Sequence, residues 1–123
     1  MILIDASVWI NHLRAADERL SALLAEDQVL GHPFILGELA LGYLRQRDLI
    51  HRSLQRLPQA AVASDREVLR LIENERLYGR GIGYIDAHLL AAVRLTPEAR
   101  LWTRDGPLQR AAAELSLAAM LPH

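Results

Sequence analysis

The N-terminal stretch Met1-Ile2-Leu3-Ile4-Asp5-Ala6-Ser7-Val8-Trp9-Ile10-Asn11 decides the fold. It opens with an apolar run, residues 1–4, that has the length and β-branched content of a buried central strand. The run stops at Asp5, so this carboxylate is predicted to lie at the carboxyl end of a strand. In open α/β sheets ligands bind at that edge, because the strand ends and the starts of the following helices form a crevice there.

The rest of the chain alternates helical and extended patterns. Apolar spacing, capping residues and the positions of glycine and proline predict helices over residues 8–13, 18–25, 34–44, 48–57, 65–77, 84–95 and 108–117. Short apolar runs predict further strands over 29–30, 60–63, 100–103 and 118–121. Strands separated by helices indicate an α/β fold in which right-handed crossovers join parallel strands. We therefore expect one domain, residues 1–123, built as a three-layer sandwich around a mostly parallel sheet of four to five strands.

The composition excludes several classes of function. The chain has 123 residues and a net charge of -1, so a nucleic acid would have to be bound by a local basic patch. It contains no cysteine, which excludes disulfides, thiolate metal sites and cysteine nucleophiles. The chain opens directly with an expected strand, and no apolar run approaches the roughly 20 residues that span a bilayer. We expect a cytoplasmic protein that does not associate with membranes.

Three further acidic residues lie in settings comparable to that of Asp5. Glu38 and Asp86 fall on predicted helices whose neighbouring positions on the same face are largely apolar. A carboxylate on such a face pays a desolvation cost unless a positive charge compensates it. Asp105 follows the predicted strand 100–103, so it can share the carboxyl edge of the sheet with Asp5. We predict that the four carboxylates converge on one site.

Each acidic residue also has an ordinary structural explanation. Asp5 and Asp105 suit turns or helix caps, Glu38 could pair with Arg45, and Asp86 could stabilise the start of its helix. Taken together, however, four crowded carboxylates repel one another unless a cation is bound. Oxygen ligands without cysteine favour Mg²⁺, with Mn²⁺ as a substitute, over zinc.

Four ordered segments resemble the PIN-domain nucleases, and most closely the toxins of VapBC toxin–antitoxin modules. The segments are ILIDASVWI at 2–10, GELALG at 37–42, GIGYIDAHLLAA at 81–92 and LWTRDGPLQRAA at 101–112. Each is short, and the specificity lies in their order and spacing across the chain. The resemblance implies a PIN-like fold and metal-dependent endoribonuclease activity.

The resemblance also assigns roles to residues. Three aspartates would hold the metal directly or through water, while the glutamate would bind the metal or position the attacking water. Some relatives have a further acidic residue where this chain has Gly106-Pro107-Leu108, which leaves open whether one metal or two are bound. The residues implied are Asp5, Glu38, Asp86 and Asp105 as catalytic carboxylates, Asp5, Asp86 and Asp105 as metal ligands, and Ser7 and Thr103 as hydroxyls that support the site.

The expected partners are RNA, a cognate antitoxin protein and a second copy of the chain. Arg104, adjacent to Asp105, and Arg80 are the candidate contacts to RNA. The resemblance implies that the antitoxin inhibits by placing a basic side chain among the acids. Several helices have more apolar residues than one small core requires, which indicates a homodimer.

Two other functions stay open from the sequence alone. A catalytically silent PIN-like interaction module would keep the fold without activity, although retention of all four acids argues against it. A phospho-acceptor or phosphatase-like domain also gathers acids at strand ends. Such domains normally hold phosphate with a lysine, which this chain lacks, and one phosphatase class needs an aspartate where Ser7 stands.

Overall fold

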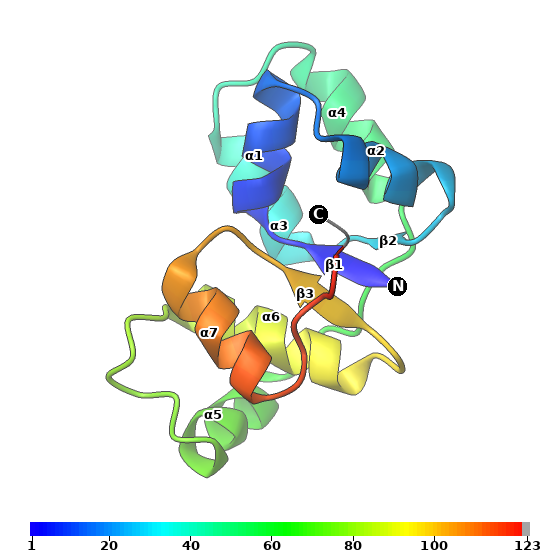
Figure 1. Cartoon of the computed structure of the whole chain (residues 1–123). Coiled ribbons are helices and arrows are strands. Elements are labelled where there is room, and N and C mark those ends of the chain that lie inside the picture. Colours follow the sequence, from blue (N-terminus) through cyan, green and yellow to red (C-terminus); the bar gives the residue numbers. More distant parts are fainter. Residues whose placement is uncertain (122–123) are drawn as a thin grey trace.

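Three parallel strands cross the middle of the molecule in the order β2-β1-β3 (Figure 1). The computed structural model describes residues 1–121. The strands are β1 (Ile2–Ile4), β2 (Val29–Leu30) and β3 (Arg100–Trp102). In the central strand β1, Leu3 and Ile4 are fully buried. The prediction of a buried central strand that ends just before Asp5 is therefore confirmed.

Two groups of helices flank the strands. In Figure 1, α1 to α4 lie above the sheet and α5 to α7 lie below it. Helix α6 is the most buried, with every residue from Ala87 to Val93 inside the core. Within residues 1–121, every helix is too short or too polar to cross a membrane. The helices are α1 (Ala6–Arg14), α2 (Glu18–Ala25), α3 (Pro33–Leu41), α4 (Arg47–Gln55), α5 (Asp65–Asn74), α6 (Tyr84–Leu95) and α7 (Gly106–Glu114).

The sheet is smaller than predicted. The predicted strand over residues 60–63 is reduced to one bridge beside β2, between Gly31 and Gln59. After that bridge the backbone N–H of Ala61 donates to Thr96 Oγ1 at 2.9 Å, which draws the chain out of the ladder. An α/β fold with a parallel sheet is confirmed, whereas the expectation of four to five strands is wrong.

The C-terminal segment does not form a strand either. Around β3, Leu101 N donates to Leu117 O at 2.7 Å and Ala119 N donates to Leu101 O at 2.8 Å. These bonds make a single bridge, between Leu101 and Ala118. The structure describes residues 118–121, and this bridge is their only pairing with the sheet. The prediction of a strand over 118–121 is therefore wrong.

Helix boundaries follow the local capping chemistry. Ser64 and Glu67 form the predicted capping box at the start of α5, with bonds of 3.1 and 2.9 Å. Helix α3 ends at Leu41, three residues before the predicted end, because Gly42 takes an extended conformation with φ −81° and ψ 163°. The early end leaves Tyr43 fully exposed.

Two buried histidines lie beneath the start of α3. His32 caps α3, and its Nδ1 accepts a hydrogen bond from the backbone N–H of Phe34 at 3.0 Å. The Phe34 ring lies between the rings of His32 and His88, with centroid distances of 5.2 and 4.7 Å. Both histidines are almost fully buried. Burial, reinforced by the nearby His88, lowers the pKa of His32 to about 4.

This arrangement predicts that acid destabilises the fold through His32. In the folded state His32 stays neutral down to about pH 4, whereas an unfolded histidine binds a proton near pH 6.5. Because the unfolded state binds the proton first, the free energy of unfolding falls as the pH drops between those values. The expected loss is on the order of 2–3 kcal/mol. Urea denaturation from pH 7 to 4 measures it. His32→Asn keeps a capping side chain without a titrating group, so its free energy of unfolding should depend less on pH than that of the parent. An equal pH dependence of the free energy of unfolding in the two proteins would contradict the prediction.

Candidate active site

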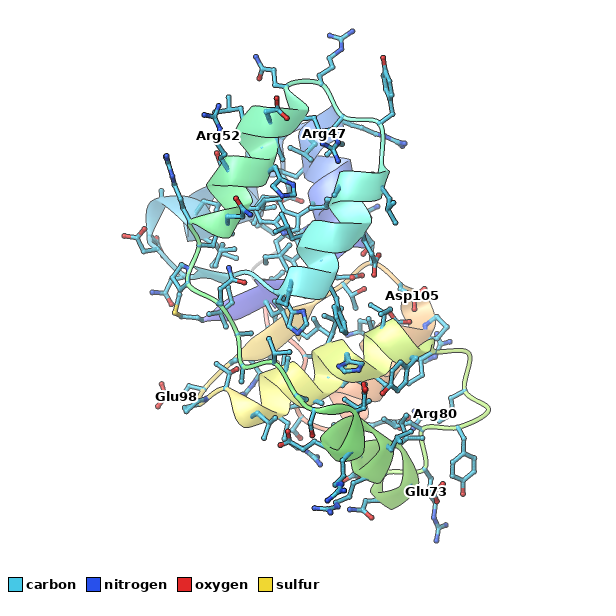
Figure 2. The ribbon with its side chains drawn as sticks, turned by 180° about the vertical axis from the view of Figure 1, so that it is seen from behind. Arg47, Arg52, Glu73, Arg80, Glu98 and Asp105 are labelled. Carbon is cyan, nitrogen blue, oxygen red and sulfur yellow. The ribbon has the colours of Figure 1, made fainter. Side chains whose placement is uncertain are left out.

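Three helices begin around the carboxyl end of the sheet, and each carries an acidic residue at its start. Asp5 occupies the N-cap position of α1, and Asp105 occupies that of α7. Asp86 lies in the first turn of α6. The positive end of a helix dipole stabilises a carboxylate at each of these positions. Figure 2 shows Asp105 near the end of α6 where that helix begins.

Hydroxyl groups fix the orientation of Asp5. Its Oδ2 accepts hydrogen bonds from Ser7 Oγ at 2.8 Å and from Thr103 Oγ1 at 2.7 Å. The same hydroxyls accept from the backbone N–H groups of Arg104 and Asp105, both at 3.0 Å. Asp5 is 7% exposed, and both bonds use one of its oxygens. The other oxygen, Oδ1, therefore remains for a ligand.

Asp86 and Asp105 each direct one oxygen to the backbone. Asp86 Oδ2 accepts from the N–H of Gly83 at 3.1 Å, and Asp105 Oδ2 accepts from the N–H of Leu108 at 3.0 Å. Asp105 is exposed, while Asp86 is half-buried. These caps satisfy amides at the helix starts and leave one oxygen of each carboxylate available.

Mutual repulsion links the four carboxylates. Glu38 is exposed on α3. Desolvation by its neighbours raises its pKa, and the negative charges of Asp5 and Asp86 raise it further. Burial also raises the pKa of Asp86, with smaller contributions from Asp5 and Asp105, against the opposing hydrogen bond from Gly83. The four groups thus share one region of negative potential, which favours a bound cation.

The structure brings the acids together without completing a coordination shell. Within residues 1–121, no three histidine or carboxylate side chains lie close enough to hold one ion between them. Mg²⁺ usually retains several waters and is anchored by one or two carboxylates, so this all-oxygen donor set suits it. The residues present fit a hydrated divalent cation.

The two predicted RNA contacts have different surroundings. Arg104 is exposed next to Asp105, and its backbone N–H supports Ser7. The guanidinium of Arg80 pairs with Glu114 on α7 instead of standing free. This ion pair ties the loop before α6 to helix α7.

A small apolar pocket that no sequence pattern predicted lies beside the first turn of α6. It has a volume of about 190 Å³ and includes the side chains of Tyr78 and Tyr84. The signal in the sequence was the pair of tyrosines on either side of the glycine-rich stretch 79–83. A larger cavity of about 530 Å³ lies at the C-terminal ends of α1 and α3 and contains none of the four acids.

Comparison with known proteins agrees with the motifs. The family model described as "PIN domain" matches residues 2–114. Two curated proteins from Mycobacterium tuberculosis, one from strain CDC 1551 / Oshkosh and one from strain ATCC 25618 / H37Rv, are both named Ribonuclease VapC32. Each is 52% identical to this chain over 118 residues, which cover 96% of this chain and 95% of the relative. Because the family model spans nearly the whole chain, this protein belongs to the PIN domain family.

Proposed function

We propose that the protein is a metal-dependent endoribonuclease that acts as the toxin of a type II toxin–antitoxin system. The observation that carries the proposal is that the acids at the starts of α1, α6 and α7 and Glu38 on α3 influence one another: desolvation and neighbouring carboxylates raise the pKa of both Glu38 and Asp86. A protein tolerates such repulsion where a cation and a substrate offset it. The 52% identity to relatives named ribonucleases supports RNA as the substrate.

The carboxylates divide into ligands and a residue that handles water. Asp5, Asp86 and Asp105 would hold Mg²⁺, or Mn²⁺ in its place, directly or through water. When bound, the ion lowers the pKa of water and stabilises negative charge on the leaving oxygen. Glu38 would position the attacking water, and its raised pKa makes its carboxylate a better acceptor of the proton of that water. The hydrogen bonds from Ser7 and Thr103 prevent Asp5 from rotating during turnover.

The proposed partners follow from the same site. A VapB-type antitoxin would inhibit by inserting an arginine or lysine among the acids, where the repulsion between Glu38 and Asp86 favours a positive charge. A homodimer would cover exposed apolar side chains around α5 and α6, since Val62 and Leu69 are each 56% exposed and Leu95 is 44% exposed. We place the protein in the cytoplasm, where RNA and the antitoxin are found.

Cleavage of RNA should depend on a divalent cation. We expect the protein to cleave total cellular RNA in Mg²⁺ or Mn²⁺, to stop in EDTA, and to recover when the metal is restored. Calorimetric titration with Mn²⁺ should detect binding that Glu38→Gln weakens, because this change removes one negative charge from the site. The matched control Glu73→Gln alters an exposed glutamate on α5 and should bind Mn²⁺ like the parent (Figure 2).

Either of two results would contradict the proposed function. One is RNA cleavage that continues unchanged in EDTA. The other is the absence of both cleavage and Mn²⁺ binding at millimolar metal, which would favour a catalytically silent interaction module.

A further inference from the structure

The first turn of α6 separates the acidic site from the apolar pocket. Asp86 and Tyr84 are two residues apart, so their side chains leave the helix in directions about 200° apart. Gly83 belongs to both sites, because its N–H donates to Asp86 and its backbone lines the pocket. The remaining walls are Tyr78, Tyr84, Ile72, Leu77, Ile82 and Ala87. We call this site the tyrosine pocket.

The tyrosine pocket has one fixed and one exposed aromatic wall. The Tyr84 hydroxyl donates to Asp65 Oδ1 at 2.7 Å, and its ring lies edge-on to His88 with a centroid distance of 4.7 Å. These contacts hold the Tyr84 ring in place while 44% of the residue stays exposed. Tyr78, on the loop before α6, is 60% exposed. Two exposed aromatic rings beside one cavity form a surface on which a planar group can stack.

The loop that carries Tyr78 is held against helix α7. Gly79 and Gly81 have φ values of +71° and +79°, which allow the tight path of the loop. Gly81 lies next to Pro107 in α7, and Arg80 pairs with Glu114 of the same helix. Asp105 is the N-cap residue of helix α7. The wall of the tyrosine pocket is therefore attached to the helix that presents one of the four acids.

We propose that the tyrosine pocket receives an unpaired base of single-stranded RNA that flanks the scissile phosphate, and so determines the sequence preference of cleavage. This inference rests on the proposed ribonuclease function. The volume of about 190 Å³ is below the roughly 300–1,000 Å³ of pockets that enclose a whole drug-sized ligand, and it suits a single ring system. Proteins recognise unpaired RNA bases by stacking them on tyrosine and other aromatic side chains.

The path of the RNA is consistent with the electrostatics of the fold. The strand would cross the N-terminal end of α6 between the acids and the pocket, and the positive end of the helix dipole favours phosphate there. None of the side chains that line the pocket is charged, so a neutral base can enter without stripping water from a charged group. The base would contribute binding, and the acids would perform the chemistry.

The test measures cleavage of a randomised single-stranded RNA pool in Mg²⁺, with sequencing of the product ends. The parent should show a base preference at one position flanking the cut. Tyr78→Ala should reduce that preference and raise KM by roughly 5- to 100-fold with little change in kcat, while Tyr78→Phe, which keeps the ring, should retain both. Tyr43→Ala removes an exposed tyrosine outside the pocket and should behave like the parent.

The outcomes separate the two proposals. A parent that cleaves no RNA in Mg²⁺ or Mn²⁺ overturns the proposed function itself. A parent that cleaves, but whose base preference and KM are unchanged in Tyr78→Ala, overturns the pocket assignment alone. The pocket assignment is also overturned if Tyr78→Ala changes only the oligomeric state, since a second copy would then be the occupant.

A second experiment uses an RNA with an abasic nucleotide at the preferred position. The parent should cleave this RNA more slowly than the intact one, whereas Tyr78→Ala should cleave both at the same rate.

Discussion

Asp5→Asn is expected to reduce RNA cleavage by roughly 10²–10³-fold, the range seen when a single preorganised electrostatic group is removed from an active site. The amide keeps a carbonyl oxygen that can accept the hydrogen bonds from Ser7 and Thr103, so the side chain should hold its position. It loses the charge that would attract the cation. Because Asp5 raises the pKa of Glu38, removing its charge should also move that pKa back toward its ordinary value.

The two consequences of Asp5→Asn are measured separately. Initial rates of RNA cleavage in Mg²⁺ report the catalytic loss, and thermal unfolding in EDTA reports stability. We expect a melting temperature equal to or above that of the parent, since one source of repulsion has been removed. Asp27→Asn is the matched control, because Asp27 is an exposed turn residue with φ +55°, a conformation that asparagine accepts readily. Cleavage by Asp5→Asn at the parental rate would rule out the metal site described above.

Thr103→Val should lower both stability and the affinity for metal. The valine has the same shape but neither donates to Asp5 nor accepts from the backbone N–H of Asp105. Thr103 is 7% exposed, so the lost bonds should cost about 1–3 kcal/mol of the free energy of unfolding. Removal of a group that orients a metal ligand typically weakens metal binding by about 10- to 100-fold.

The control for Thr103→Val is Thr103→Ser, which restores the hydroxyl. Urea denaturation gives the free energy of unfolding, and the Mn²⁺ concentration for half-maximal cleavage gives the effect on metal affinity. The serine variant should recover most of both quantities. If the valine variant is destabilised but needs no more Mn²⁺ than the parent, then Thr103 supports the fold without orienting Asp5.

The sequence predicted the features that depend on local patterns. The apolar run 1–4, the box made by Ser64 and Glu67, and the starts of α2, α5 and α6 are each decided by neighbouring residues, and the structure confirms them. Helices α1 and α7 begin two residues earlier than predicted. The strand count depended on pairing between distant segments. Residues 59 and 118 each meet the sheet at one point, since contacts such as that between Ala61 and Thr96 take the chain elsewhere.

The features of the candidate site also fall into those that local motifs predict and those that depend on packing between distant segments. The identity of the acids and the supporting hydroxyls was predictable, because each motif is contiguous in the sequence. The pairing of Arg80 with Glu114 arises when the loop before α6 packs against α7, and the tyrosine pocket arises when the same loop packs against α5 and α6. No local pattern encodes that packing. The four carboxylates as catalytic groups stay a prediction that the variants above would test.

The double hydrogen bond on one oxygen of Asp5 has a consequence for the choice of metal. With Oδ2 engaged by Ser7 and Thr103, Asp5 has a single oxygen to offer, and the buried setting prevents the carboxylate from turning to present both. Calcium collects six to eight oxygen ligands and often binds both oxygens of a carboxylate, whereas magnesium accepts single ones and fills its remaining positions with water. The proposed metal site would therefore discriminate against calcium, because Asp5 withholds its second oxygen.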